Sequence, residues 1–111
     1  MSVQKGELIW VDFDPTRGHE QQKRRPAIVV SASTFNDRMG GIVWVLPITS
    51  KKKGRPDEIA LPDGLPVRGV LLLSQLRALD IAARGFERIG MVPDEFMDDE
   101  VSGRLIAVLE G

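Results

Sequence analysis

The feature that most constrains this chain is a series of short apolar runs, rich in β-branched and aromatic residues, separated by Gly, Pro, Asn and Asp. Runs of this length between turn-forming residues predict a compact, mostly β domain. Period-two alternation in the first run places Val11 and Phe13 on the face opposite Trp10. The expected strands are 8–13, 27–31, 42–48, 58–61, 70–76 and 88–92.

The last segment changes from a strand period to a helix period. Pro93 suits the first turn of a helix, and apolar residues recur at helical spacing from Met97 to Leu109. Carboxylates gather within 94–100, near the positive end of the helix dipole. This predicts a C-terminal amphipathic helix packed on the sheet. Shorter helical turns are expected at 34–37 and 79–83, and Gly85 ends the second of them.

A chain of 111 residues, 42% of them hydrophobic, fits one domain spanning 1–111 with one modest core. So small a domain leaves apolar surface that a second subunit can cover, so we expect a homodimer. The absence of cysteine excludes disulfides, thiolate metal sites and cysteine nucleophiles, and favours the cytoplasm. The start of the chain lacks the pattern of a signal peptide, and no apolar stretch approaches membrane-spanning length.

The net charge of −1 hides an uneven distribution along the chain. Residues 91–111 hold six carboxylates and one arginine, so the first 90 residues carry a net charge of +4. Cations gather in two clusters, which are Arg17, Lys23, Arg24 and Arg25, then Lys51, Lys52, Lys53 and Arg55. Clusters of this kind suit a polyanion such as nucleic acid, although a charge run is more often only a solvated surface.

A polar segment, 14–26, lies between the first two expected strands and is long for a hairpin connection. It holds the only histidine of the protein, His19, beside Glu20 and Gln21. His19 or Glu20 could take the proton of an RNA 2′-hydroxyl, and Arg25 could hold two oxygens of a phosphate that gains negative charge. On residue types alone, a solvated loop with Arg25 paired to a carboxylate is the better explanation of the segment, because polar loops are common.

Two further groups stand at strand ends. Thr49, Ser50 and Lys51 could bind a phosphate, but hydroxyls of this kind are also ordinary turn residues. Gln75 and Arg77 would matter only if the fold brings them near the other clusters. With one histidine and no cysteine, a zinc site of the usual kind is not expected. The sequence also contains no glycine-rich motif for binding a nucleotide cofactor.

The order of these motifs resembles the MazF/PemK/Kid family of toxin endoribonucleases, and places the chain nearer the MazF-like branch. The resemblance is carried by GELIWVDFDPTRGHEQQ at 6–22, RPAIVV at 25–30, VLPITS at 45–50, QLR at 75–77 and ARG at 83–85. These motifs cover almost the whole chain, in order and with few gaps.

The resemblance implies an SH3-like twisted β-barrel of the CcdB/MazF type, with short helices and a C-terminal α-helix. It also implies a homodimer that cleaves single-stranded RNA at short sequence motifs without a metal or cofactor. The products would carry a 2′,3′-cyclic phosphate and a 5′-hydroxyl. Such a toxin inhibits translation and growth until a cognate MazE-like antitoxin, with an acidic disordered tail, covers the RNA site.

The resemblance also assigns roles to residues. Arg25 and Thr49 match the principal catalytic positions, and Glu20 matches a supporting acid–base position. Positions that contact substrate are matched by His19, Gln21, Gln75 and Arg77. Neighbouring side chains expected to bind the RNA are Lys23, Arg24, Ser50 and Lys51.

One departure from the family pattern limits these assignments. Kid-like members place an arginine and an aspartate, which contribute to the chemistry, where this chain has Leu72 and Ser74. The chemistry here would rest on Glu20, Arg25 and Thr49, with His19 as an alternative base. Two other readings stay open, a CcdB-like toxin that binds gyrase without catalysis and an RNA-binding module that has lost its activity.

Overall fold

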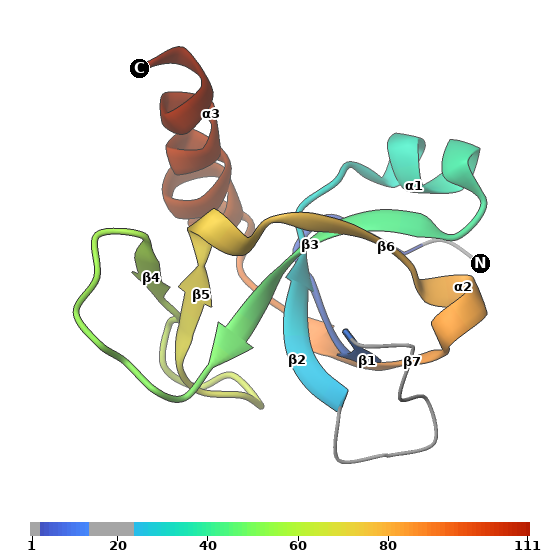
Figure 1. Ribbon diagram of the computed structural model, residues 1–111, viewed down its shortest axis with the longest axis horizontal. Helices are drawn as coiled ribbons and strands as arrows, with labels where there is room; N and C mark the ends of the chain where they lie inside the picture. Colours follow the sequence, from blue (N-terminus) through green and yellow to red (C-terminus); the bar gives the residue numbers. More distant parts are fainter. Residues whose placement is uncertain (1–2, 14–23) are drawn as a thin grey trace.

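The computed structural model describes residues 3–13 and 24–111, and its centre is a strongly twisted antiparallel sheet (Figure 1). The strands are β1 (Glu7–Asp12), β2 (Arg24–Val29), β3 (Ile42–Thr49), β4 (Glu58–Ala60), β5 (Val70–Leu72), β6 (Arg77–Asp80) and β7 (Phe86–Met91). The helical elements are α1 (Ser33–Met39), the 3-10 turn η3 (Leu73–Gln75), α2 (Ile81–Arg84), the π-helical η4 (Phe96–Ser102) and α3 (Gly103–Glu110).

The strands follow the order β4-β5-β3-β2-β1-β7, and β6 also pairs with β3. One half of β3 pairs with β6 and the other half with β5, so η3 carries the chain from one partner to the other. Within the described ranges, β4 and β7 end the sheet and do not pair with each other. The prediction of a mostly β, twisted fold with a C-terminal helix is therefore confirmed, and the barrel is an open one.

Strand β2 begins earlier than the sequence pattern predicts. Arg24 and Arg25 lie opposite Asp12 and Val11 of β1, so they belong to the sheet and not to the polar connection. Their charge hides the strand from a pattern based on apolar alternation. The backbone of β2 therefore fixes the position of Arg25.

The region 70–85 also differs from expectation. The single strand expected at 70–76 is β5 followed by η3, and a further strand, β6, takes part of the region predicted as a helical turn. The turn itself is α2, which ends at Gly85 with a φ of 78°, as predicted. Asp80 caps α2 by accepting a hydrogen bond from the Ala83 backbone N–H at 3.1 Å.

The core consists of two apolar clusters on the two faces of the sheet. Because side chains alternate along a strand, neighbouring residues such as Leu8 and Ile9 enter different clusters. One face packs against Met97 and Val101 of η4. The other, which we call the inner cluster, consists of Val3, Ile9, Val11, Ala27, Val29, Val43, Val45, Leu79 and Ile81.

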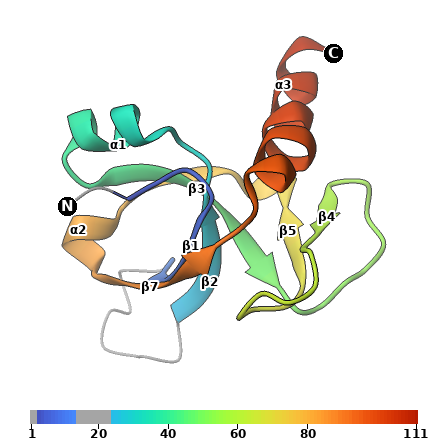
Figure 2. The ribbon, with the colours of Figure 1, turned by 180° about the vertical axis from the view of Figure 1, so that it is seen from behind.

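The C-terminal helix packs on the sheet only through its first turns. Met97 and Val101 are buried, whereas Val108 is 68% exposed and Leu109 is 85% exposed. Both views show α3 at the end of the molecule where β4 and β5 lie, away from α1 and α2 (Figures 1 and 2). The predicted amphipathic helix is thus present, but the apolar side chains near its end face solvent.

Candidate functional site

Three of the residues predicted to act on RNA, Arg25, Thr49 and Arg77, lie on one face of the sheet. Ala27 is opposite Pro47, and Arg25 and Thr49 each stand two residues from this pair, beyond the same end of the β2–β3 pairing. Arg77 lies opposite Val45 on the other side of β3. All three share their face with the inner cluster, because alternate residues of a strand point to the same side. Arg25 is two residues from Ala27 and Arg77 is two residues from Leu79. Thr49 is four residues from Val45.

The ring of Phe13 joins two of these residues. The guanidinium carbon of Arg25 lies 5.6 Å from the ring centroid, and that of Arg77 lies 5.5 Å from it. Phe13 itself packs against the inner cluster, so the same ring contacts both the apolar core and the two cations. Among the described residues, neither guanidinium forms an ion pair with a carboxylate.

Thr49 is the last residue of β3, and its hydroxyl is fixed by a turn. The hydroxyl oxygen accepts a hydrogen bond from the Lys51 backbone N–H at 3.2 Å. A hydroxyl that accepts in this way still has its own proton to donate, for example to a phosphate oxygen. Gly69 makes the turn possible, since a Cβ at this position would stand 2.2 Å from the Thr49 carbonyl oxygen.

The remaining candidates are less closely grouped. Arg24 points to the opposite face of β2 from Arg25, and its guanidinium forms an ion pair with Glu87 at 3.4 Å. Ser50 and Lys51 are exposed just beyond Thr49, and Gln75 is exposed at the end of η3, close in sequence to Arg77. Four candidates, His19, Glu20, Gln21 and Lys23, lie outside the described residues.

Ser74, at one of the two departures from the family pattern, has a structural partner. A hydrogen bond from the Ser74 hydroxyl is the main cause that lowers the pKa of the Asp57 carboxyl, and the Arg55 charge adds to it. The Arg55 guanidinium lies 3.1 Å from the same carboxylate. The Leu73 backbone N–H also donates to the Asp57 carbonyl oxygen at 2.9 Å, so this group ties η3 to the segment before β4.

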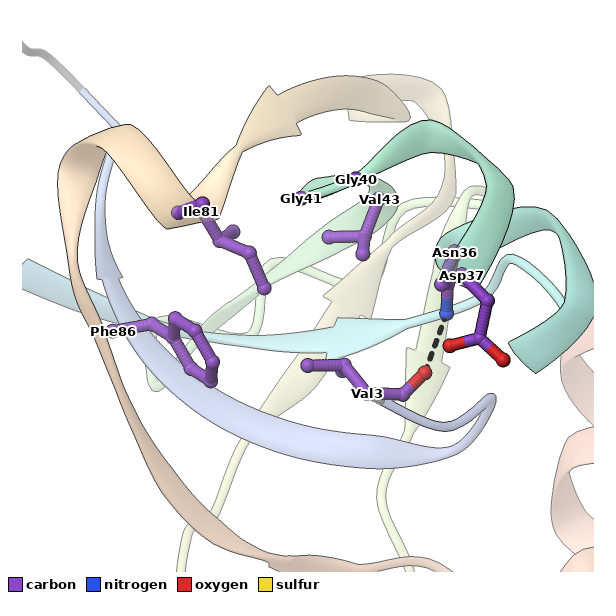
Figure 3. Close-up of a pocket in the computed structure, with 9 residues that line it drawn as sticks. Val3, Asn36, Asp37, Gly40, Gly41, Val43, Ile81 and Phe86 are labelled. Atoms are coloured by element: carbon purple, nitrogen blue, oxygen red, sulfur yellow. Dashed lines mark hydrogen bonds between the residues drawn. The ribbon is translucent and has the colours of Figure 1, made fainter. Parts of the chain in front are cut away.

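A separate hollow of about 330 Å³ lies between α1, α2 and the N-terminal segment (Figure 3). Its wall is largely apolar, with Val3, Val43 and Phe86 among the side chains that line it. Asn36 is buried there, and its amide donates to the Val3 carbonyl oxygen at 2.7 Å. With its polar group already bonded within the fold, this hollow resembles a gap between packed elements more than a reactive site.

Residues 3–13 and 24–111 contain no group of three or more His, Cys, Asp or Glu side chains that could hold a metal ion. Every helix in these ranges is too short or too polar to cross a membrane.

Two residues of the site were not singled out from the sequence. Phe13 was placed only on a strand face, although its alternation with Val11 already set it on the face that carries Arg25. Gly69 gives no local signal, because the reason for glycine is the approach of a distant strand end at Thr49.

Comparisons with known proteins agree on one family. Residues 4–109 match the model of the PemK-like, MazF-like toxin of type II toxin–antitoxin systems. The endoribonuclease toxin MazF of Escherichia coli K12 is 43% identical over 90 residues, which covers 81% of this chain and 79% of that protein.

Solved structures give the same result for the fold. A crystal structure of MazF from Deinococcus radiodurans superposes with a TM-score of 0.83 at 38% identity, and the match covers 100% of this chain and 99% of that one. A chain from a MazE–MazF crystal structure of the same organism superposes with a TM-score of 0.82 at 34% identity, covering 99% and 97% of the two chains.

Proposed function

Because the chain belongs to the PemK-like, MazF-like toxins of type II toxin–antitoxin systems, we propose that it is an endoribonuclease toxin that cuts single-stranded mRNA. The RNA 2′-hydroxyl attacks the adjacent phosphate, leaving a 2′,3′-cyclic phosphate and a 5′-hydroxyl. The reaction needs no metal or cofactor, since a side chain and water can move the two protons. We place this single-domain protein in the cytoplasm, where its mRNA substrate is found.

The observation that carries the proposal is the pair of guanidiniums, Arg25 and Arg77, that rest on Phe13 without a carboxylate partner among the described residues. A phosphate that gains charge in the transition state is stabilised by cations already in place. Arg25 stabilises this charge. It does not act as a general acid, because a guanidinium hardly loses a proton. Arg77 binds the RNA backbone beside it.

Thr49 and Glu20 complete the proposed catalytic group. The Thr49 hydroxyl donates to a phosphate oxygen, in keeping with its orientation by the Lys51 backbone N–H. Glu20 takes the proton of the 2′-hydroxyl, with His19 as the alternative base, and the leaving 5′-oxygen takes a proton from water. Gln21, Lys23, Arg24, Ser50, Lys51 and Gln75 are proposed to bind the RNA around this centre.

The proposed base follows from the departure at Leu72 and Ser74. Ser74 is engaged with Asp57, and Leu72 lies in β5 opposite Glu58, so neither residue offers a base. Proton removal therefore falls to the segment that carries His19 and Glu20. Family membership does not favour the gyrase-binding reading.

We further propose that a MazE-like antitoxin binds this chain and blocks RNA. The related Deinococcus structure is a MazE–MazF complex. An acidic peptide and RNA are both polyanions, so either can pair with Arg25 and Arg77. The two ligands should then compete.

We also propose that the toxin acts as a homodimer, joined through an exposed apolar surface that we call the helix face. Its side chains line a hollow of about 540 Å³ beside α3, and they are Trp44, Leu73, Leu76, Leu105, Val108 and Leu109. Trp44 is 45% exposed although it is large and apolar. A contiguous apolar surface of this kind typically marks a protein contact, and a two-fold dimer buries the same surface of both copies.

One experiment tests the catalytic proposal. Purified protein is incubated with a long single-stranded RNA in EDTA, and the 5′ ends of the fragments are mapped with and without prior phosphorylation. Cuts at one short motif, 5′ ends that ligate only after phosphorylation, and loss of cutting in Arg25→Ala are the expected results. Intact RNA with inhibited gyrase, or RNA that is bound and not cut, would overturn it.

A further inference from the structure

Phe13 occupies a position that the proposed mechanism does not yet use. Its ring packs against the inner cluster, and the guanidinium carbons of Arg25 and Arg77 lie within 5.6 Å of its centroid. Because both distances are measured to the same centroid, the two guanidinium carbons are separated by at most twice that distance. Phe13 is the one described side chain that contacts both cations through an aromatic face.

The fold brings the three residues together from distant parts of the chain. Phe13 follows β1, Arg25 is in β2 beside β1, and Arg77 begins β6 on the far side of β3. In the register of the sheet, Val11 lies opposite Arg25, and Val45 lies opposite Arg77. The Phe13 ring, at the end of β1, therefore contacts two cations that stand on separate strands, Arg25 on β2 and Arg77 on β6.

The contact suits a site that must hold cations ready for an anion. The face of an aromatic ring carries negative potential and attracts a guanidinium, yet it does not occupy the N–H donors as a carboxylate does. Arg24 and Arg55 illustrate the other case, because each directs its guanidinium at a carboxylate. A ring also lessens the freedom of two long side chains whose like charges would otherwise drive them apart.

We propose that Phe13 is a positioning residue that holds Arg25 and Arg77 at a fixed spacing, with Arg25 on the reacting phosphate and Arg77 on the adjacent RNA backbone. The inference rests on the proposed ribonuclease function. Loss of the ring would free both guanidiniums, and a small misplacement of a catalytic group can lower a rate by about 100-fold. Phe13 makes no contact with the reacting atoms itself.

The test weakens the electrostatics of the ring while keeping its shape. Phenylalanine at position 13 is replaced by its 4-fluoro, 3,5-difluoro and 3,4,5-trifluoro analogues, each of which reduces the negative potential of the ring face. Single-turnover cleavage of a short RNA should slow stepwise, by about tenfold in the trifluoro variant, while the melting temperature stays constant. The same series at Phe86, which packs against the same cluster, should leave the rate unchanged.

Conventional variants extend the test. Phe13→Leu should lower the cleavage rate by about 100-fold, whereas Phe13→Tyr should keep most of the wild-type rate. In an Arg77→Ala background, the further loss caused by Phe13→Leu should be smaller than in the wild-type chain, because one of the two contacts is already gone.

The outcomes separate the two proposals. A wild-type protein that does not cut RNA overturns the ribonuclease function and the role of Phe13 with it. If the wild-type protein cuts RNA and the fluorinated variants cut it at the same rate, only the role of Phe13 is overturned. In that case a lower melting temperature of Phe13→Leu would identify the ring as ordinary core.

Discussion

The cations at two ends of the sheet differ in their partners. Around Phe13, the guanidiniums of Arg25 and Arg77 lie on an aromatic ring. Beside β4 and α3, Arg55 forms an ion pair with Asp57 at 3.1 Å, and Arg104 forms one with Glu100 at 3.1 Å. Only the first arrangement leaves positive charge available to an incoming anion, because carboxylates neutralise the second.

The same two ends differ in their apolar side chains. At the Phe13 end, the ring is half-buried and packs against the core. At the α3 end, Trp44, Val108 and Leu109 expose much of their surface. The net charge therefore says little about this protein, since one end suits a polyanion and the other suits an apolar protein surface.

Arg24 and Arg25 are neighbours in β2 and differ in their partners in the same way, so the same substitution at both tests whether the partner matters. Arg25→Lys keeps the charge and loses the planar fork, so we expect single-turnover cleavage to fall by about 100- to 1,000-fold. Arg24→Lys should change it by less than about threefold, because lysine keeps the positive charge near the RNA and an exposed ion pair contributes little. Rates are measured on one RNA for both variants. Equal losses would mean that the aromatic and carboxylate partners do not distinguish the two cations.

The second prediction concerns the helix face. Val108→Asp places a charge in the proposed dimer contact, and we expect the dimer dissociation constant to rise by about 100-fold. Ile106→Asp is the matched control, since Ile106 is also exposed on α3 but does not line the hollow. Sedimentation velocity over a range of concentrations measures both. If the two variants dissociate equally, or if the wild-type chain is a monomer, the helix face is not the dimer contact.

How far the sequence predicted this molecule depends on how local each signal is. The mostly β fold and the C-terminal helix follow from apolar periods, and Arg25, Thr49 and Arg77 follow from motifs that resemble a family. Strand β6 and the start of β2 were not predicted from the sequence. Arg24, Arg25 and Arg77 lie in strands, but their charge removes the apolar pattern that marks a strand.

The role of single side chains was harder to predict, because it depends on contacts distant in sequence. Phe13 meets Arg77 only after β1, β2, β3 and β6 have formed one sheet. Ser74 was noted as a departure from a family pattern, and only the fold shows that Asp57 is its partner. Neither contact has a sequence spacing that a motif could record.

Gly69 lies against the Thr49 carbonyl group, so a larger residue there should displace Thr49. Gly69→Ala would set a Cβ 2.2 Å from the Thr49 carbonyl oxygen at a φ of 133°, so we expect a loss of about 2–3 kcal/mol in the free energy of unfolding. Gly64→Ala, at a φ of 88° in open space, should cost only about 1 kcal/mol. Urea unfolding measures this difference.

Cleavage by folded protein then reports on Thr49. Under conditions where both variants are fully folded, Gly69→Ala should cut RNA about tenfold more slowly than Gly64→Ala, because the Thr49 turn has moved. A Gly69→Ala protein that is less stable but cuts at the normal rate would remove Thr49 from the proposed catalytic group.

The smallest effect is expected at the α3 end, where the pKa of Asp57 is lowered by the Ser74 hydroxyl and by Arg55. A carboxyl with a lowered folded pKa stabilises the fold above its unfolded pKa, about 3.8, and loses this contribution as the pH falls through the folded value. The difference in unfolding free energy between the wild-type chain and Asp57→Asn should therefore be constant from about pH 7 to pH 5 and shrink below about pH 4. In a Ser74→Ala background the change with pH should be weaker, because the largest cause of the shift is gone. A difference that stays constant down to pH 2.5 would show that carboxylate pairing at this end contributes no stability, and the contrast between the two sets of cations would then rest on the Phe13 end alone.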